Sequence, residues 1–210
     1  MSKSAVILAG GFSSRFGQDK GLLQLTDKPL IRHVLDAISS LVDEKMVVAS
    51  SKVQVENYTK VLGSEVNVLT DVDDVHSPLV GALTGFKEAH GTYVLLLSCD
   101  TPFVSRDVVS LLFDLCINRY AAIPRWPNGY IEPLQAVYCA EPAYEAAEEA
   151  LSEGKLNMQS MVDRMRSVRY VSTLVLQQID PELRTFFNIN TPLDLKKAEF
   201  MFKHKGKAKS

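Results

Sequence analysis

Short apolar runs alternate along the chain with longer stretches in which apolar residues recur every three or four positions. Four runs have the length and composition of strands: Ser4–Ala9, Met46–Ala49, Val66–Leu69 and Tyr93–Ser98. Three amphipathic stretches have helical spacing: Leu30–Leu41, Val53–Leu62 and Leu79–Ala89. The last run is apolar throughout, as expected for a strand covered on both faces. Strands that alternate with helices predict right-handed β-α-β units and a mainly parallel sheet.

The second half of the chain predicts further elements. Pro133–Tyr138 alternates like a strand, and we expect helices at four places: after Ser105, over Glu141–Leu151, over Ser160–Met165 and from Thr191. Ser77-Pro78 supplies an N-cap and a first-turn proline, and Thr191-Pro192-Leu193-Asp194 resembles a capping box. We expect one domain over residues 1–202 and a disordered basic tail over residues 203–210.

Composition restricts the class of protein. The chain has 210 residues, 46% of them hydrophobic, and a formal net charge of -2 from 23 basic and 25 acidic side chains. This length suffices for a core without disulfides, and the balanced charge argues against a nucleic-acid partner. Three widely spaced cysteines indicate a reducing, cytoplasmic location. The first apolar run is too short for a signal sequence or a membrane span, so we expect no membrane partner.

The first predicted strand opens into a glycine-containing loop. The segment from Leu8 to Lys20 contains neither G-x-G-x-x-G nor G-x-x-x-x-G-K-[ST], which disfavours dinucleotide dehydrogenases and P-loop NTPases. The adjacent glycines allow main-chain N–H groups to approach an anion, and Arg15 and Lys20 add positive charge suited to a polyphosphate. The alternative is an ordinary turn with surface charges, but the combination in one loop favours a phosphate site.

The same loop carries a family resemblance. LAGGFSSRFGQDK resembles the signature L-A-G-G-x-S-x-R-[MF]-G-x-D-K of nucleotidyltransferases, and within them the molybdenum cofactor guanylyltransferases of the MobA type. Three later motifs follow in the family's order: Ser77–Gly81, Cys99–Phe103 and Phe186–Pro192. The resemblance implies a Rossmann-like three-layer αβα nucleotidyltransferase fold with a small antiparallel extension. It also implies a GTP-binding half over about residues 1–104 and an acceptor half over about 105–202.

Two carboxylates stand at predicted strand ends. Asp100 follows Tyr93–Ser98, where an oxygen ligand would suit Mg²⁺; the alternative is that it caps a turn. A carboxylate such as Asp71 could accept from both N1–H and the exocyclic amine of guanine. Spacing does not separate Asp71 from Asp73 and Asp74, but resemblance favours Asp71 and also supports Asp100 as the metal ligand.

The last motif contains alternating asparagines. Asn188 and Asn190 should point to one side of an extended segment, towards the site, unless they merely precede a helix. The resemblance places them at the acceptor end, with Ile131–Gln135 as a looser match. The predicted site residues are in three groups: catalytic Arg15, Lys20 and Asp100; GTP-binding Leu8, Ala9, Gly10, Gly11, Lys20, Asp71 and Asp100; acceptor-binding Asn188 and Asn190.

The resemblance implies transfer of GMP from GTP to the phosphate of molybdopterin, with Mg²⁺ as cofactor and release of pyrophosphate. Alternatives are transfer of another nucleotide, transfer to a sugar phosphate or phospholactate, or a nucleotide-binding module without turnover. Partners would be other cofactor-biosynthesis proteins or molybdoenzyme chaperones. Ser50 stands where many family members have asparagine. Trp126 could stack on a pterin or cover the core edge, and Cys99 is interpreted as a buried structural thiol.

Overall fold

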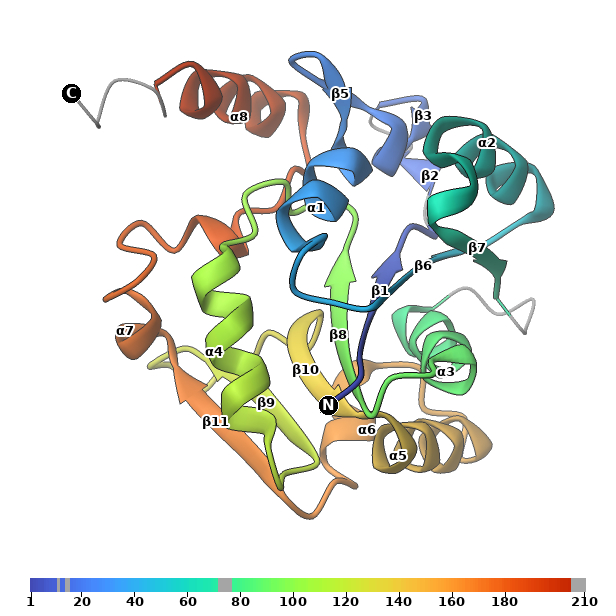
Figure 1. Cartoon of the computed structure of the whole chain (residues 1–210), viewed down its shortest axis with the longest axis vertical. Coiled ribbons are helices and arrows are strands. Elements are labelled where there is room, and N and C mark those ends of the chain that lie inside the picture. Colours follow the sequence, from blue (N-terminus) through green and yellow to red (C-terminus); the bar gives the residue numbers. More distant parts are fainter. Residues whose placement is uncertain (11, 14–15, 72–76, 205–210) are drawn as a thin grey trace.

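Seven strands form the central sheet of the computed structural model, which describes residues 1–10, 12–13, 16–71 and 77–204 (Figure 1). Their order is β11-β9-β10-β8-β1-β6-β7. The bounds are β1 (Lys3–Leu8), β6 (Glu44–Ala49), β7 (Asn67–Thr70), β8 (Tyr93–Ser98), β9 (Ala121–Arg125), β10 (Gln135–Cys139) and β11 (Val168–Ser172). Only β10 runs antiparallel to its neighbours in this sheet. The predicted α/β class with a mainly parallel sheet is confirmed.

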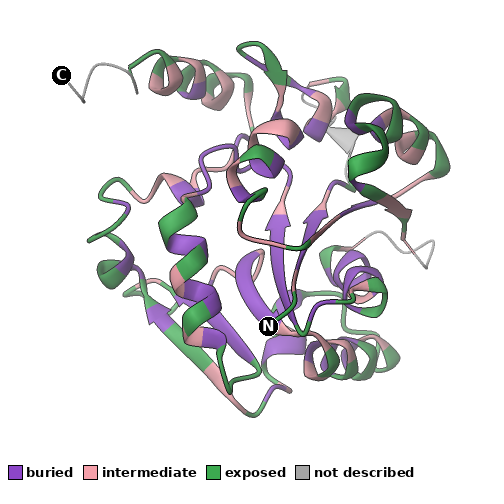
Figure 2. Ribbon diagram, viewed as in Figure 1, coloured by how far each residue is buried: buried purple, intermediate pink, exposed green. Residues whose placement is uncertain are grey.

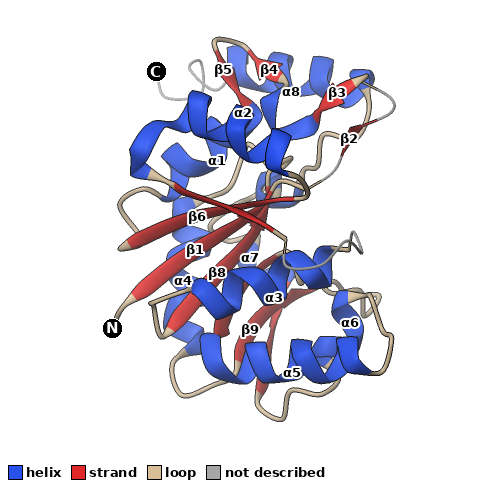
Figure 3. Ribbon diagram, turned by 90° about the vertical axis from the view of Figure 1, so that its right-hand side faces the viewer, coloured by secondary structure: helices blue, strands red, loops and turns tan. Residues whose placement is uncertain are grey.

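Helices cover both faces of the sheet (Figure 3). One face packs against α1 (Leu30–Ile38), α2 (Lys52–Leu62) and α4 (Arg106–Cys116). The other packs against α3 (Pro78–Glu88), α5 (Ala140–Ser152) and α6 (Met158–Val162). The side chains of β1 alternate between these two cores, since Ala5 and Ile7 join the first and Val6 the second. The central strands are therefore buried on both sides (Figure 2), which explains their continuous apolar sequences.

Two predicted helix starts, at Ser77-Pro78 and at Thr191-Pro192, are confirmed by their caps. Ser77 Oγ accepts from the Val80 N–H at 3.2 Å, ahead of Pro78 in the first turn of α3. In α8 (Pro192–His204), Thr191 and Asp194 exchange hydrogen bonds between side chains and backbone N–H groups, at 2.9 and 3.2 Å. This reciprocal pair is a capping box. The helix includes Lys203 and His204, two residues that we had expected in the tail, and the rest of that tail lies outside the described residues.

Two strands and one helix start differ from the sequence prediction. The strands β9 and β11 were not predicted, because neither has the pattern of a central strand. β9 contains Pro124, which has no N–H to donate to a neighbouring strand. β11 is an edge strand in which three consecutive side chains are exposed or half-exposed. The sixth helix begins at Met158 rather than Ser160, because Asn157 Oδ1 accepts from the Ser160 N–H at 2.9 Å.

A third, smaller core above the sheet joins the segment that follows β1 to the C-terminal segment (Figure 1, top). The chain after β1 forms two short hairpins, β2 (Phe12–Ser13) with β3 (Gln18–Asp19) and β4 (Gln24–Leu25) with β5 (Lys28–Pro29). Apolar residues of this region pack against Phe103, Ile189 and α8. The glycine loop and the C-terminal asparagine motif are thereby brought together. Within the described part of the chain, we find no helix that is long and apolar enough to cross a membrane.

One short helix and three 3₁₀ turns complete the described elements. α7 (Thr173–Leu176) follows β11, and Leu176 is fully buried in the first core. Single 3₁₀ turns lie at Lys20–Leu22, Gly63–Glu65 and Arg184–Phe186.

Candidate active site

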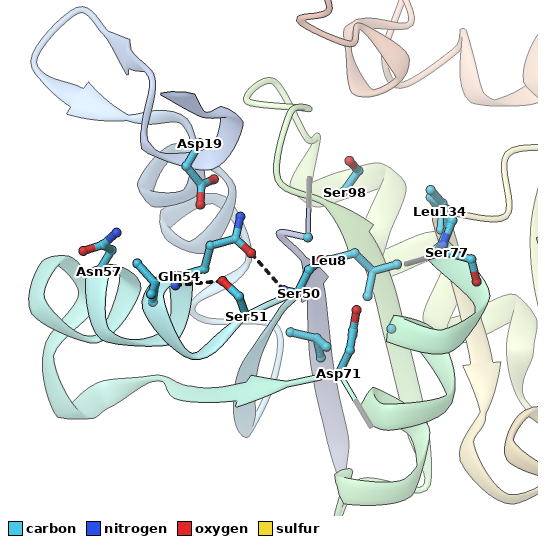
Figure 4. A pocket seen from close by; sticks show the side chains of 15 residues that line it. Leu8, Asp19, Ser50, Ser51, Gln54, Asn57, Asp71, Ser77, Ser98 and Leu134 are labelled. Carbon is cyan, nitrogen blue, oxygen red and sulfur yellow. Dashed lines mark hydrogen bonds between the residues drawn. The ribbon is translucent and has the colours of Figure 1, made fainter. Parts of the chain in front are cut away.

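A cavity of about 710 Å³ lies where the parallel strands end (Figure 4). Leu8 ends β1, Ser50 follows β6, Asp71 follows β7 and Ser98 ends β8, and all four line the cavity. α2 contributes residues from its first turns and α3 contributes its N-terminus at Ser77 and Pro78. This is the edge at which open, mainly parallel α/β sheets bind ligands.

Glycines permit close backbone packing at two points of this cavity. A Cβ atom on Gly10 would overlap Ser50 Oγ, so the loop after β1 approaches the end of β6 as closely as a residue without a side chain permits. A Cβ on Gly81 of α3 would lie 3.1 Å from Leu8 Cδ2 and 3.2 Å from Asp71 Oδ1. Both glycines therefore allow the backbone around the cavity to pack more closely than a side chain would permit.

Lys20, Asp100 and Asn190 meet beside the cavity although they lie far apart in the sequence. The Lys20 ammonium forms an ion pair with the Asp100 carboxylate and donates to Asn190 Oδ1 at 2.6 Å. Ser98 Oγ donates to the other Asp100 oxygen at 2.6 Å, and the Ile189 N–H donates to the Asp100 carbonyl at 3.0 Å. The Asp100 side chain is only 9% exposed, so the ion pair is largely withdrawn from water. Three predicted site residues are thus in direct contact.

Asp71 and Ser50 lie at the cavity just past the ends of the paired strands β7 and β6 (Figure 4). The Asp71 N–H donates to the Ala49 carbonyl at 2.9 Å, which extends the β6 pairing and fixes the start of the loop. The Ser50 N–H donates to Gln54 Oε1 at 2.9 Å, while Ser51 Oγ accepts from the Gln54 N–H at 3.2 Å and caps α2. The region where we expected a family asparagine is thus organised by Gln54, one turn into the helix.

The C-terminal asparagines differ from each other. Asn190 reaches Lys20, but Asn188 Nδ2 donates to the Phe186 carbonyl at 3.1 Å, within its own segment. Ile189 is fully buried and Phe187 packs on the same third core, as the alternating pattern predicted. The structure therefore brings one of the two predicted acceptor residues to the Lys20–Asp100 pair.

Trp126 packs within the protein. Its ring meets Phe186 edge to face at 5.7 Å between centroids, and its Nε1–H donates to Glu132 Oε1 at 2.7 Å. Burial raises the pKa of the Glu132 carboxyl, although the bond from Trp126 acts in the opposite direction. Of the two interpretations of Trp126, the packing fits the cover of a core edge.

Some predicted site residues lie outside the described residues, and some described ones were not predicted. Gly11, Arg15 and the alternatives Asp73 and Asp74 belong to the first group. Ser98, Gln54, Asp19 and Tyr58 belong to the second. The sequence does contain a signal for Ser98, a hydroxyl at the end of an apolar strand, and for Asp19, an aspartate directly before Lys20. The contacts of Tyr58 and Gln54 are visible only in three dimensions.

The donor set suits a cation that shares its ligands with a substrate. Within residues 1–10, 12–13, 16–71 and 77–204, no group of three or more His, Cys, Asp or Glu could enclose a metal. Asp100 nevertheless presents a hard oxygen donor beside a cavity of nucleotide size, and Mg²⁺ commonly binds through one or two carboxylates together with substrate phosphates. The neighbouring Cys99 is buried, and burial raises the pKa of its thiol, which disfavours it as a ligand or nucleophile.

Comparison with known proteins agrees with this geometry. The model of the MobA-like NTP transferase domain matches residues 5–168. A protein of Methanosarcina mazei named "probable molybdenum cofactor guanylyltransferase" is 35% identical, and the match covers 92% of this chain and 88% of the relative. The molybdenum cofactor guanylyltransferase of Desulfosudis oleivorans is 32% identical, and the match covers 95% of this chain and 96% of the relative. The crystal structure of molybdopterin-guanine dinucleotide biosynthesis protein A from Archaeoglobus fulgidus superimposes with a TM-score of 0.81 at 29% identity, covering 95% of this chain and 98% of that one.

Proposed function

Since the chain belongs to the MobA-like NTP transferase family, we propose that it is a molybdenum cofactor guanylyltransferase. It transfers GMP from GTP to the terminal phosphate of molybdopterin and forms a guanine dinucleotide with loss of pyrophosphate. The match to curated guanylyltransferases extends over most of both chains, which supports the activity as well as the fold. The acceptor phosphate attacks the α-phosphorus, the bond to the bridging oxygen of the β-phosphate breaks, and that oxygen leaves on pyrophosphate.

The nucleotide binds in the cavity at the strand ends, whose lining comes from residues 1–104 except for Leu134. Leu8, Ala9, Gly10 and Gly11 provide backbone groups for the phosphates, and Arg15 and Lys20 balance their charge. Asp71 accepts from N1–H and the 2-amino group of guanine, a donor pair that adenine does not have. The location of Asp71 in the cavity wall, apart from Lys20, fits a base at one end and phosphates at the other.

The proposed cofactor is Mg²⁺, and the proposed protein ligand of the cation is Asp100. When bound, the cation would neutralise charge on the phosphates. Ser98 Oγ holds one Asp100 oxygen, and Lys20 contacts the other, so the carboxylate has a fixed orientation before any ligand binds to it.

The rest of the chain positions the reactants, because phosphoryl transfer of this kind needs alignment and charge neutralisation rather than a protein nucleophile. Asn188 and Asn190 orient the acceptor, which lies towards residues 105–202. Asn190 accepts a hydrogen bond from Lys20, so the residue that contacts the acceptor is coupled to the residue that contacts the triphosphate. Partners that deliver molybdopterin or receive the product would be other cofactor-biosynthesis proteins or molybdoenzyme chaperones, in the cytoplasm.

The proposal rests most directly on the contacts of Lys20 with Asp100 and Asn190, next to Ser98 of the cavity lining. Asp100→Asn tests it, because the amide keeps an acceptor for Ser98 Oγ but loses the charge that a cation requires. We expect release of pyrophosphate from GTP to fall at least about 100-fold while the melting temperature stays near that of the wild type. A loss of folding with retained activity per folded molecule would mean that Asp100 is a structural residue.

A further inference from the structure

Tyr58 lies directly beneath the loop that carries Lys20. It belongs to α2, its side chain is fully buried, and its hydroxyl donates to Asp19 Oδ1. The Ala9 carbonyl is 3.5 Å from the same hydroxyl, so the tyrosine stands between the chain leaving β1 and the chain returning from the glycine loop. It thus touches both limbs of the proposed phosphate-binding loop.

Asp19 is the residue at which the returning limb changes direction. It pairs with Phe12 in the β2–β3 hairpin, and it caps the 3₁₀ turn Lys20–Leu22 by accepting from the Gly21 N–H at 3.2 Å. The next residue is Lys20. The bond from Tyr58 therefore reaches the residue immediately before the lysine whose ammonium contacts Asp100 and Asn190.

Gly21, on the other side of Lys20, packs against the same tyrosine. A Cβ on Gly21 would lie 3.2 Å from both Cε1 and Cζ of Tyr58 and would overlap its hydroxyl oxygen. The ring consequently rests on the Gly21 backbone, while its hydroxyl holds Asp19. One buried side chain thus fixes the backbone on both sides of Lys20.

The environment keeps the Tyr58 hydroxyl as the donor of this hydrogen bond. Burial raises the pKa of Tyr58, so the phenol retains its proton. Burial also raises the pKa of Asp19, against the opposing effects of hydrogen bonds from Tyr58, Gly21 and Gln54. Asp19 lines the cavity, but a carboxylate would repel phosphate; its hydrogen bonds within the protein fit a role in shaping the loop instead.

We propose that Tyr58 is a positioning residue for Lys20, acting through Asp19 and Gly21 to hold the lysine where it meets the phosphates of the nucleotide. This inference rests on the proposed function for the role of Lys20. It adds a residue of α2, outside the glycine motif, to the determinants of triphosphate affinity.

The test compares GTP with guanosine as ligands of purified Tyr58→Phe, by isothermal titration calorimetry. The substitution removes one hydroxyl and leaves the ring on Gly21. We expect GTP to bind about tenfold more weakly, whereas guanosine, which has no phosphate, binds as to the wild type. Tyr93→Phe is the matched control: Tyr93 is also buried, and its hydroxyl accepts from the Asn118 N–H at 3.3 Å, but it lies at the other end of β8. Equal losses for both ligands, or the same loss in Tyr93→Phe, would overturn the inference.

A second measurement repeats Tyr58→Phe in a Lys20→Met background. If Tyr58 acts through Lys20, GTP affinity should not fall further in the double variant. A full additional loss would contradict the inference, while unchanged GTP affinity in Lys20→Met alone would refute the proposed role of Lys20 itself. Gly21→Ala disturbs the same contact from the opposite side. It should also weaken GTP more than guanosine, and it decides the question if Tyr58→Phe folds poorly.

Discussion

The ammonium of Lys20 forms an ion pair with the carboxylate of Asp100, across 80 positions of sequence. In the proposed function, Lys20 binds phosphate and Asp100 binds Mg²⁺. In the ion pair, each side chain instead provides the counter-charge of the other. A nucleotide that arrives with its cation supplies both groups with stronger partners at once. Nucleotide and metal should therefore bind together, because either alone leaves one member of a poorly exposed pair without its counter-charge.

Removal of the lysine charge should favour the cation in the absence of nucleotide. In Lys20→Met, Asp100 has no ammonium in contact, so we expect Mn²⁺, used as a probe for Mg²⁺, to bind at least severalfold more tightly. Electron paramagnetic resonance of free Mn²⁺ measures this directly. Lys28→Met is the control, because its exposed ion pair with Asp36 is remote from Asp100 in the sequence and joins β5 to α1. Weaker Mn²⁺ binding in Lys20→Met would contradict the expected competition between Lys20 and the cation for Asp100.

Asp71→Asn should change the choice of base. The amide offers one acceptor and one donor in place of two acceptors, so it cannot satisfy both donors of guanine. We expect affinity for GTP to fall roughly 100-fold, while xanthosine triphosphate, whose 2-oxo group accepts a hydrogen bond, binds better than to the wild type. Thermal shift with each nucleotide provides the comparison. Equal affinities of the variant and the wild type for both nucleotides would exclude Asp71 as the base contact.

Gly85→Ala should destabilise the protein despite the higher helix propensity of alanine. A Cβ on Gly85, in the middle of α3, would lie 2.8 Å from Cγ2 and 3.1 Å from Cβ of Val6 in β1. The gain in propensity is about 1 kcal/mol, whereas overpacking of this kind costs about 1–3 kcal/mol. Urea unfolding should therefore give a lower free energy of unfolding. In a Val6→Ala background most of the steric cost should disappear; a constant cost in both backgrounds would disprove the contact.

Glu132 should make the emission of Trp126, the one tryptophan of the sequence, depend on pH. Burial raises the pKa of Glu132 in the folded state above its ordinary value of 4.5. The fold thus holds the proton more tightly than the unfolded chain, and the resulting stabilisation is present at low pH and is lost as pH rises through the folded pKa. Trp126 fluorescence should titrate with a midpoint above 4.5 in the wild type.

Glu132→Gln provides the control for that titration. Glutamine keeps an acceptor for the indole N–H but does not ionise. We expect no such midpoint in the variant, and its free energy of unfolding should rise relative to the wild type between about pH 4 and pH 7. A wild-type midpoint at or below the ordinary glutamate value would show that burial does not dominate.

The sequence predicts those features that depend on neighbouring residues. The strands β1 and β8 are apolar because they are covered on both faces, and the caps at Ser77 and Thr191 use side chains within three positions of their partners. Lys20 and Asp100 were identified because a loop motif and a strand-end motif resemble a family. These features are local, so a single sequence contains the information needed to recognise them.

Features that depend on distant contacts could not be predicted in this way. β9 contains Pro124 and becomes a strand because β10 and β11 flank it. Tyr58 has the pattern of an ordinary core residue of an amphipathic helix, and only the fold brings its hydroxyl to Asp19. Similarly, alternation gave Asn188 and Asn190 the same direction, but the local bond of Asn188 to Phe186 separates their contacts. In each case tertiary packing decides between locally acceptable conformations.

Release of pyrophosphate by the purified protein distinguishes a guanylyltransferase from a related transferase and from a binding module without turnover. The assay supplies molybdopterin and Mg²⁺ with GTP, CTP, ATP or UTP in parallel, and a sugar phosphate replaces molybdopterin in a second series. We expect release with GTP and molybdopterin, at a rate at least about 100-fold above that of any other combination. Faster release with CTP or with a sugar phosphate, or nucleotide binding without release in every combination, would contradict it.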